Sequence, residues 1–263
     1  MLNVDEHSAV SLAVTSSHPP SSGRYSPPPL QITPHPAWLE QMLHSLNALW
    51  EAACWPSLFQ KMMDNHRPPL KHWQRFLCEG FLIVENFPKY MGMSLAKTTY
   101  GKRPGDASVR RWFLQNLSVE AKHAEWWIDW MRALGVEPEI AFTATPRPEW
   151  QALHEHLFDT CRNASLAEGV AASNWAIEGI TGVWSRRVEK SFRAYADDGI
   201  QINYQSMMWL KAHARYDDAH PHEALEILKQ NVDETTDHPR QVEAAARKSL
   251  VLFTRAVEAC CID

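Results

Sequence analysis

The stretch HARYDDAHPHEAL, residues 213–225, places three histidines and two aspartates within ten residues. If it is helical, His213, Asp217 and His220 are spaced i, i+4 and i+7 and therefore share one face of the helix. Pro221 disfavours the α conformation in the residue before it, so we expect the helix to break after His220. Three possible metal ligands on one face raise the question of which partners the rest of the chain supplies.

The chain around this stretch has the composition of an all-α protein. It contains 263 residues, of which 45% are hydrophobic and only 10 are glycine, and its apolar residues recur with helical spacing and no competing strand pattern. Residues 1–36 are rich in serine and proline, which predicts a disordered or draped N-terminal tail. Residues 37–263 are expected to form one helical-bundle domain.

The expected helices follow from apolar periodicity, caps and breakers. Pro88 is expected to kink or break the helix that contains it, and Ser108 is expected to cap a helix that ends at Gly135. The helical segments expected on this basis are 37–63 as one or two helices, 70–97, 109–134, 151–163, 166–196, 203–220, 221–232 and 240–261.

Charge, cysteine content and hydropathy argue against several classes of protein. The formal net charge is −5, which does not favour binding to nucleic acid. The five cysteines form no C-x-x-C motif and are odd in number, which indicates a reducing compartment without a disulfide framework. No run of about 18 apolar residues predicts a membrane span, and the N-terminus lacks the basic start of a signal peptide. We therefore expect a cytoplasmic protein.

Three further segments place acids where helical geometry can bring them to one centre. Glu120 and His123 are spaced i, i+3 and so share a face. Glu178 and Glu85 each lie within a run of aromatic and aliphatic residues, in NWAIEGITGVW and GFLIVENFPKY. A carboxylate enclosed in this way is costly unless it is paired, hydrogen-bonded or bound to a metal.

The order of these residues along the chain points to a carboxylate-bridged metal centre. The series is Glu85, Glu120-x-x-His123, Glu178 and Asp217-x-x-His220. Di-iron and di-manganese helical bundles use this series, because two hard cations close together need anionic oxygens to bridge them and imidazoles to complete each coordination sphere. The pattern predicts two iron ions per chain, with manganese as a less favoured substitute. Zinc is disfavoured, since its sites use few ligands, often thiolates.

Each residue taken alone also has an interpretation without a metal. An isolated E-x-x-H is often a capping or surface pair, and Asp217 could pair with Arg215 on a solvated face. Glu178 could form a buried salt bridge with Arg186. All of these in one chain, in this order and spacing, would be a rarer outcome than one metal site.

The pattern of His213, Asp217 and His220 resembles the last-ligand helix of haem-oxygenase-like di-iron oxidases and oxygenases, in the superfamily of TenA-like thiaminases and pyrroloquinoline-quinone synthase (PqqC). The segments HAEWWIDWMRALGV and SNWAIEGITGVW are similar to two other helices of that group, so the resemblance spans residues 38–255. It implies an all-α fold, a single haem-oxygenase-like (TenA/PqqC-like) bundle. The metal ligands that it implies are Glu120, His123, Glu178, His213, Asp217 and His220.

The resemblance carries one departure and several expectations. Many members place the first glutamate one turn earlier, where this chain has Asn116, so Glu120 takes that role here. Glu85 would be an additional carboxylate that ligates the metal or contacts substrate. The group also implies loosely held iron, no haem, and a homo-oligomer, for which the tryptophan-rich segment 38–55 is a candidate interface.

The function implied is that of a non-haem di-iron oxidase or oxygenase that activates O2 to oxidise a small organic, amino-acid-like metabolite. The expected partners are this substrate and O2, with no nucleic acid and no membrane. Three alternatives share the fold: a metal-free TenA-like hydrolase with Cys161 as its candidate nucleophile, a metal-free PqqC-like oxidase, and a non-catalytic TenA-like regulatory protein.

Overall fold

The computed structural model describes residues 26–63, 67–103, 105–216 and 220–262, and within these ranges the chain folds into helices without a β-strand. The all-α prediction is therefore confirmed. The elements are α1 (Ala37–Cys54), α2 (Ser57–Met63), α3 (Leu70–Ala96), α4 (Asp106–Glu120), α5 (His123–Ala133), α6 (Pro138–Thr143), α7 (Pro148–Asn163), α8 (Leu166–Val170), the π-helix η1 (Ala171–Glu178), α9 (Gly179–Phe192), the 3-10 helix η2 (Arg193–Asp198), α10 (Met208–Tyr216), α11 (His220–Asn231) and α12 (His238–Ala259).

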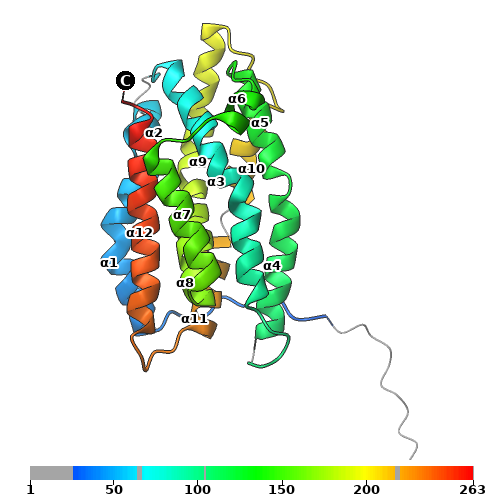
Figure 1. Ribbon diagram of the computed structural model, residues 1–263, viewed down its shortest axis with the longest axis vertical. Helices are drawn as coiled ribbons and strands as arrows, with labels where there is room; N and C mark the ends of the chain where they lie inside the picture. The colour runs from blue at the N-terminus through cyan, green and yellow to red at the C-terminus, as the bar shows by residue number, and fades with distance from the viewer. Residues whose placement is uncertain (1–25, 64–66, 104, 217–219, 263) are drawn as a thin grey trace, which may run out of the picture.

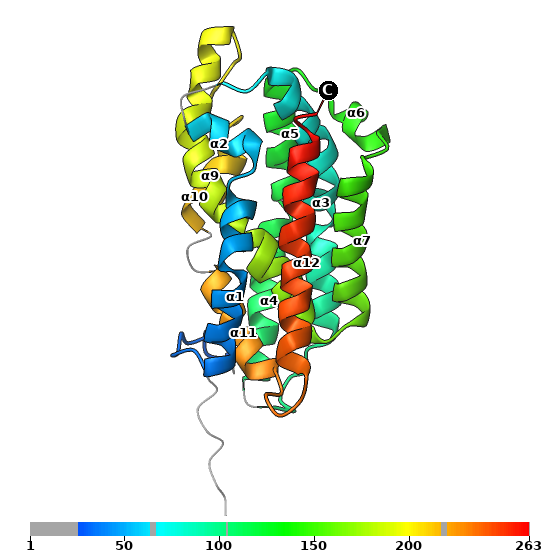
Figure 2. The same cartoon turned by 90° about the vertical axis from the view of Figure 1, so that its left-hand side faces the viewer.

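The long helices run side by side along the long axis of the bundle (Figures 1 and 2). The π-helix η1 lies at the centre, where it packs against α12, α11, α7 and α3. On one side, α3 also packs against α4, α5 and α7, and on another α10 packs against α5 and α9. None of the described helices is both long and apolar enough to cross a membrane.

Helix α3 runs from Leu70 to Ala96 with Pro88 inside it, so the helix does not break at this residue, and a kink there stays a prediction. A proline inside a helix costs about 3 kcal/mol because it removes a backbone hydrogen bond and crowds the preceding turn. The packing of α3 against three neighbouring helices offsets that cost. The helix therefore reaches Ala96 and presents its apolar face to the interior over its whole length.

One continuous helical rod runs from α8 through η1 into α9. It begins with a capping box, in which Ser165 Oγ accepts a hydrogen bond from the Glu168 N–H at 3.2 Å and Glu168 Oε2 accepts one from the Ser165 N–H at 2.9 Å. The rod widens to π-helical geometry over Ala171–Glu178 and returns to α geometry at Gly179. Turns of this kind are rare and frequently occur at functional sites.

Aromatic side chains fill much of the core, and the abundance of tryptophan, with 12 copies, has a structural explanation. Trp73 packs edge-on against Phe76 with ring centroids 5.6 Å apart, and Phe59 stacks on Trp184 at 4.4 Å. Edge-to-face and stacked pairs of this kind contribute roughly 0.5–1.5 kcal/mol each beyond the area they bury. The aromatic network joins α2, α3 and α9 into a rigid frame.

Residues 26–36 precede α1 and form an extended segment, which we name the strap, that is hydrogen-bonded to α11 and α4. Both the backbone N–H and the hydroxyl of Thr33 donate to the Glu226 carboxylate at 2.9 Å, and Lys229 Nζ donates to the Thr33 carbonyl at 2.7 Å. Arg111 Nη1 donates to Ser26 Oγ at 3.1 Å. The strap is thus tied to α11 and α4, while residues 1–25 of the expected tail lie outside the described part of the chain.

Candidate metal centre

Glu120 and His123 face each other across a short break in the backbone. Glu120 is the last residue of α4, His123 is the first residue of α5, and a two-residue turn at 121–122 separates them. The single helix expected over 109–134 is therefore two helices, and α4 starts at Asp106 after a left-handed Gly105 rather than at Ser108. The two side chains still meet, with His123 Nδ1 2.7 Å from Glu120 Oε2.

Glu178 occupies the end of the π-helix η1 and is 5% exposed. Its Oε1 lies 2.7 Å from His220 Nδ1, and its Oε2 accepts a hydrogen bond from Asn174 Nδ2 at 3.0 Å. Both oxygens therefore have partners, as a carboxylate buried this deeply requires. Asn174 was not singled out in the sequence. Its position one turn before a buried glutamate in the same apolar run was the signal available.

His220 reaches this centre from a different helix than expected. The sequence predicted a helix over 203–220 that carries His213 and His220 and breaks after His220, whereas α10 ends at Tyr216 and His220 is the first residue of α11. Pro221 explains the difference, because proline is favoured in the first turn of a helix and unfavourable in its interior. The shared-helix argument for these two histidines was wrong, and Asp217 lies outside the described residues.

His213 is held in one tautomer by the backbone. Its Nδ1 lies 2.8 Å from the Trp209 carbonyl oxygen, which can only accept, so Nδ1 carries the proton and Nε2 carries the lone pair. The indole of Trp209 stacks on the imidazole with ring centroids 3.8 Å apart. The ring centroid of His123 is 4.5 Å from that of His213. A second hydrogen bond that fixes the tautomer is characteristic of metal-binding histidines.

Glu85 lies away from this group. Its side chain is exposed on α3 and accepts a hydrogen bond from Asn86 Nδ2 at 3.0 Å. Its negative charge acts on Tyr90 and His154, toward α7. The expectation that apolar neighbours enclose Glu85 was wrong, because on a helix the flanking apolar residues of a continuous run point in several directions.

The structure thus brings together Glu120, His123, Glu178, His213 and His220, which we name the acid–histidine cluster. Burial and the Glu178 carboxylate raise the pKa of Glu120 well above its ordinary value. Burial also favours a raised pKa for Glu178, but the hydrogen bond and charge of His220 outweigh it and lower that pKa. Burial lowers the pKa of His123 to about 4, and burial with the neighbouring His123 lowers that of His213 well below its usual range.

The donor types in the cluster suit iron. Besides burial, the main causes of the pKa shifts are Glu178 and His220 for Glu120, and His220, Asn174 and His123 for Glu178. A cation between them would relieve the carboxylate repulsion and oppose the rise in the pKa of Glu120. Neutral imidazole, the form in which His123 and His213 stand, is the metal-binding form. In the described part of the chain, however, no three of these side chains yet converge on one point.

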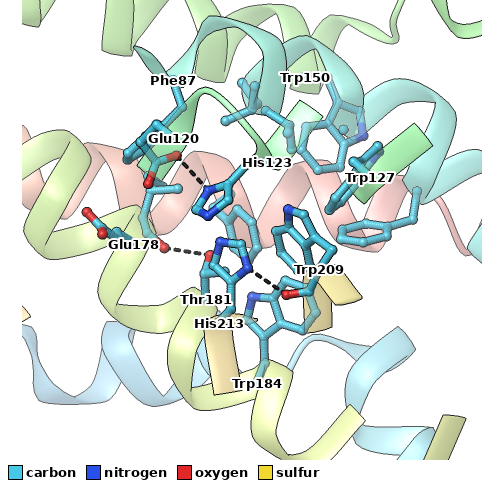
Figure 3. A pocket seen from close by; sticks show the side chains of 16 residues that line it. Phe87, Glu120, His123, Trp127, Trp150, Glu178, Thr181, Trp184, Trp209 and His213 are labelled. Carbon is cyan, nitrogen blue, oxygen red and sulfur yellow. Dashed lines mark hydrogen bonds and ion pairs between the residues drawn. The ribbon is translucent and has the colours of Figure 1, made fainter. Parts of the chain in front are cut away.

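An apolar cavity of about 60 Å³ adjoins the cluster. Figure 3 shows the carboxylates of Glu120 and Glu178 on one side of it and the rings of Trp127, Trp150 and Trp209 on the other. Its lining comprises Phe76, Gly80, Ile83, Val84, Phe87, Glu120, His123, Trp127, Trp150, Ile177, Glu178, Thr181, Trp184, Trp209, His213 and Phe253. The cluster supplies the cavity's charged groups, and aromatic and aliphatic side chains supply most of the remainder.

A second, larger cleft of about 360 Å³ borders the same histidines beside the end of α4. Its lining comprises Ser118, Val119, Lys122, His123, Trp126, Ala212, His213 and His220. His123 and His213 line both spaces, so the cluster stands between an apolar interior and the surface beside α4. The cleft thus places exposed residues at the end of α4 next to the imidazoles of the cluster.

Comparisons with known proteins bear on the family and the fold of the chain. The family described as "Iron-containing redox enzyme" matches residues 74–253. A crystal structure of a TenA homologue from Pseudomonas syringae pv. tomato strain DC3000 is 34% identical, with TM-score 0.80 over 89% of this chain and 97% of that chain. No curated protein matches the sequence.

More distant structures share the fold. A domain of unknown function with a haem-oxygenase-like fold from Shewanella denitrificans is 19% identical, with TM-score 0.68 over 84% of this chain and 91% of that chain. A TenA family transcription regulator from Silicibacter sp. TM1040 is 11% identical, with TM-score 0.67 over 88% of this chain and 99% of that chain. The haem-oxygenase-like, TenA-like bundle expected from the sequence is confirmed.

Proposed function

The chain belongs to the family of iron-containing redox enzymes, and from this premise we propose that it is a non-haem di-iron oxidase or oxygenase that uses O2 to oxidise a small apolar organic molecule. The observation that carries the proposal is the acid–histidine cluster: two buried carboxylates and three imidazoles that adjoin an apolar cavity. Bound iron would supply the activation of O2.

The residues proposed to hold the iron are Glu120, His123, Glu178, His213 and His220, together with Asp217. Within this set, the Trp209 carbonyl orients His213 so that Nε2 faces away from the helix backbone. Asn174 holds one oxygen of Glu178, which leaves the other oxygen to His220 or to a metal. These two hydrogen bonds keep the donor atoms in place, because each partner is itself buried in the core.

The cavity favours an apolar substrate over the amino-acid-like molecule expected from the sequence. An amino acid would carry an ammonium and a carboxylate into the site, and each would need a partner of opposite charge. Beyond the cluster, the described side chains that line the cavity are aromatic or aliphatic, with Thr181 as the polar exception. Thr181 donates its hydroxyl to the Ile177 carbonyl at 2.7 Å, so its proton is already used.

The metal-free hydrolase has less support from the geometry. Its candidate nucleophile, Cys161, is 0% exposed and does not line the cavity. Burial raises the pKa of the Cys161 thiol, which disfavours the reactive thiolate. Its Sγ is directed to the Gly169 carbonyl at 3.7 Å and to Ser173 Oγ at 3.8 Å, contacts of a buried structural cysteine.

The test is an anaerobic titration of the purified protein with Fe(II), followed by exposure to air while the visible absorbance is recorded. We expect about two irons per chain and a transient visible band after air is admitted. Glu178→Ala and His213→Ala should each abolish most of this uptake. Glu85→Ala is the matched control, because this glutamate is exposed outside the cluster, and it should bind iron as the wild type does. Binding at background level, or equal binding by all four proteins, would refute the proposal.

A further inference from the structure

The surface of α4 and the loop before it is basic on a protein whose net charge is −5. The described residues of segment 97–124 contain two acids, Asp106 and Glu120, and both are buried, at 7% and 5% exposure. The basic side chains of this surface, which are exposed or half-buried, are Lys102, Arg103, Arg110, Arg111 and Lys122. The charge of this surface is therefore opposite in sign to that of the whole protein.

Apolar side chains are interspersed with these bases. Leu114 is 52% exposed, Val119 is 40% exposed and Tyr100, in the preceding loop, is 60% exposed. Leu114 follows Arg110 by four residues on α4, and Val119 precedes Lys122, in the turn after α4, by three, so each of these apolar side chains lies within one helical turn of a basic one. We name this combination of bases and apolar side chains the α4 face. Helix α4 packs mainly against α3 and α5, and it lies along one side of the bundle (Figure 1). A mixed basic and apolar surface suits a protein partner better than a nucleic acid, whose binding rests chiefly on charge.

The α4 face is also where the acid–histidine cluster comes nearest to solvent. The cleft of about 360 Å³ is lined by Ser118, Val119 and Lys122 of this face and also by the imidazoles of His123 and His213. Glu120 itself ends α4. A partner seated on the α4 face would therefore stand next to the cluster, with only the width of the cleft between them.

From these observations we propose that the α4 face is the docking surface for an acidic protein that donates single electrons to the iron site. This inference rests on the proposed function, because it assigns the source of that reaction's electrons. Opposite charge steers the two proteins together and speeds their encounter, as is usual in short-lived redox complexes. The exposed Leu114 and Val119 would form the dry centre of a small interface of the kind such encounters use.

The electron balance of the reaction requires such a donor. Reduction of O2 to the oxidation level of water takes four electrons, and a two-electron oxidation of substrate supplies half of them. The other two would come from two donor molecules, each oxidised by one electron in its own encounter at the α4 face, with the protons taken from water. Iron held by the acid–histidine cluster would receive these electrons.

The binding test uses the full-length, iron-free protein and an acidic plant-type [2Fe–2S] ferredoxin as the probe, with the dissociation constant measured by calorimetry at low and high salt. We expect Lys102→Glu/Arg110→Glu/Lys122→Glu to weaken binding about tenfold or more at low salt, and high salt to weaken binding by the wild type. The control, Lys190→Glu/Lys248→Glu/Arg255→Glu, makes the same change of net charge at exposed sites on α9 and α12 and should bind as the wild type does.

A second variant, Leu114→Ser/Val119→Ser, tests the apolar part of the face without altering charge and should also weaken binding. In the ferric, iron-loaded protein, reduction by reduced ferredoxin should slow in the α4 variants, while reduction by dithionite should not. Absence of ferredoxin binding, equal weakening in the control, or tighter binding of a DNA duplex than of ferredoxin would overturn the inference. Because the binding arm needs no iron, its result is independent of whether the iron titration succeeds.

Discussion

The bundle buries two groups of polar side chains that contain histidine, and the two differ in charge. In the first, which we name the structural group, His156 Nε2 lies 3.1 Å from the Ala245 carbonyl oxygen and 3.1 Å from Ser249 Oγ, and Thr160 Oγ1 lies 3.3 Å from His156 Nδ1. Every partner there is neutral. These hydrogen bonds join α7 to α12, which also pack against each other.

The acid–histidine cluster has the same degree of burial but carries two carboxyl groups whose charges oppose each other. A neutral, fully bonded group stabilises the fold by itself, whereas like charges buried together cost stability until a cation joins them. The comparison teaches that burial of a histidine alone does not indicate function. The two groups differ because the partners of His156 are neutral, whereas the acid–histidine cluster contains the carboxyl groups of Glu120 and Glu178.

The largest expected effect on stability lies in the structural group. His156→Ala should lower the free energy of unfolding by about 2–4 kcal/mol, because it leaves a cavity and removes the partner of Ser249 and Thr160. Urea unfolding followed by circular dichroism measures this change. The folded variant should bind as much iron per chain as the wild type. If the variant is as stable as the wild type but no longer binds iron, His156 belongs with the iron site and the assignment to the structural group is wrong.

Asn174→Leu tests the cluster through its buried hydrogen bond to Glu178. Leucine has a similar volume but cannot donate to Glu178 Oε2, so iron affinity should fall about 10–100-fold, as for other residues that orient metal ligands. Competition with a chelator measures the affinity. Asn86→Leu is the matched control, since Asn86 is buried on α3 and donates to the Leu82 carbonyl outside the cluster. Equal losses in both variants would show a general effect of burying leucine.

The smallest expected effect has the opposite sign. In the iron-free protein, Glu120→Gln should raise the free energy of unfolding by about 1 kcal/mol at neutral pH. The folded pKa of Glu120 lies above the ordinary value of 4.5, so the wild type loses stability as pH rises from 4.5 toward that folded pKa. The variant lacks this loss, and the difference between the two should grow over that interval. Thermal unfolding at several pH values measures it, with Glu40→Gln, exposed on α1, as control. A Glu120→Gln protein that is less stable than the wild type at neutral pH would contradict the account.

Much of the cluster could be predicted because its residues stand out against their neighbours. Glu178 lies among apolar residues, and Glu120 and His123 have a helical spacing that is visible in the sequence. His213 was predicted from its spacing to His220, although the two lie on different helices. Spacing alone did not reveal that Glu120 and His123 lie on two helices, because the break at 121–122 leaves both residues close to helical conformation. Glu120 and His123 therefore meet as predicted, although the single helix expected to carry both is two helices.

Other features depend on forces that no local pattern records. Pro221 signalled a break, but it permits a helix that ends at His220 as well as one that begins there, and the structure has the second. Glu85 and Glu178 sit in similar apolar runs, yet only tertiary packing determines which of them points inward. We identified no local sequence signature for the π-helix, whereas the bond between Asn174 and Glu178 joins residues four apart on one helix, a spacing that is visible in the sequence.

The π-helical segment Ala171–Glu178 has a consequence for how this chain tolerates change in length. A wide turn accommodates a residue that a regular α-helix would not hold, so deletion of one residue before Glu178 could restore ordinary α geometry without breaking the rod. The helix would survive with α8 and α9 near their present rotation about its axis, because the residue removed is the one that the wide turn holds in excess. If α9 kept its place, a different side chain would stand where Asn174 now meets Glu178. A chain shortened in this segment could therefore remain folded and yet lose the hydrogen bond that holds Glu178 in the acid–histidine cluster.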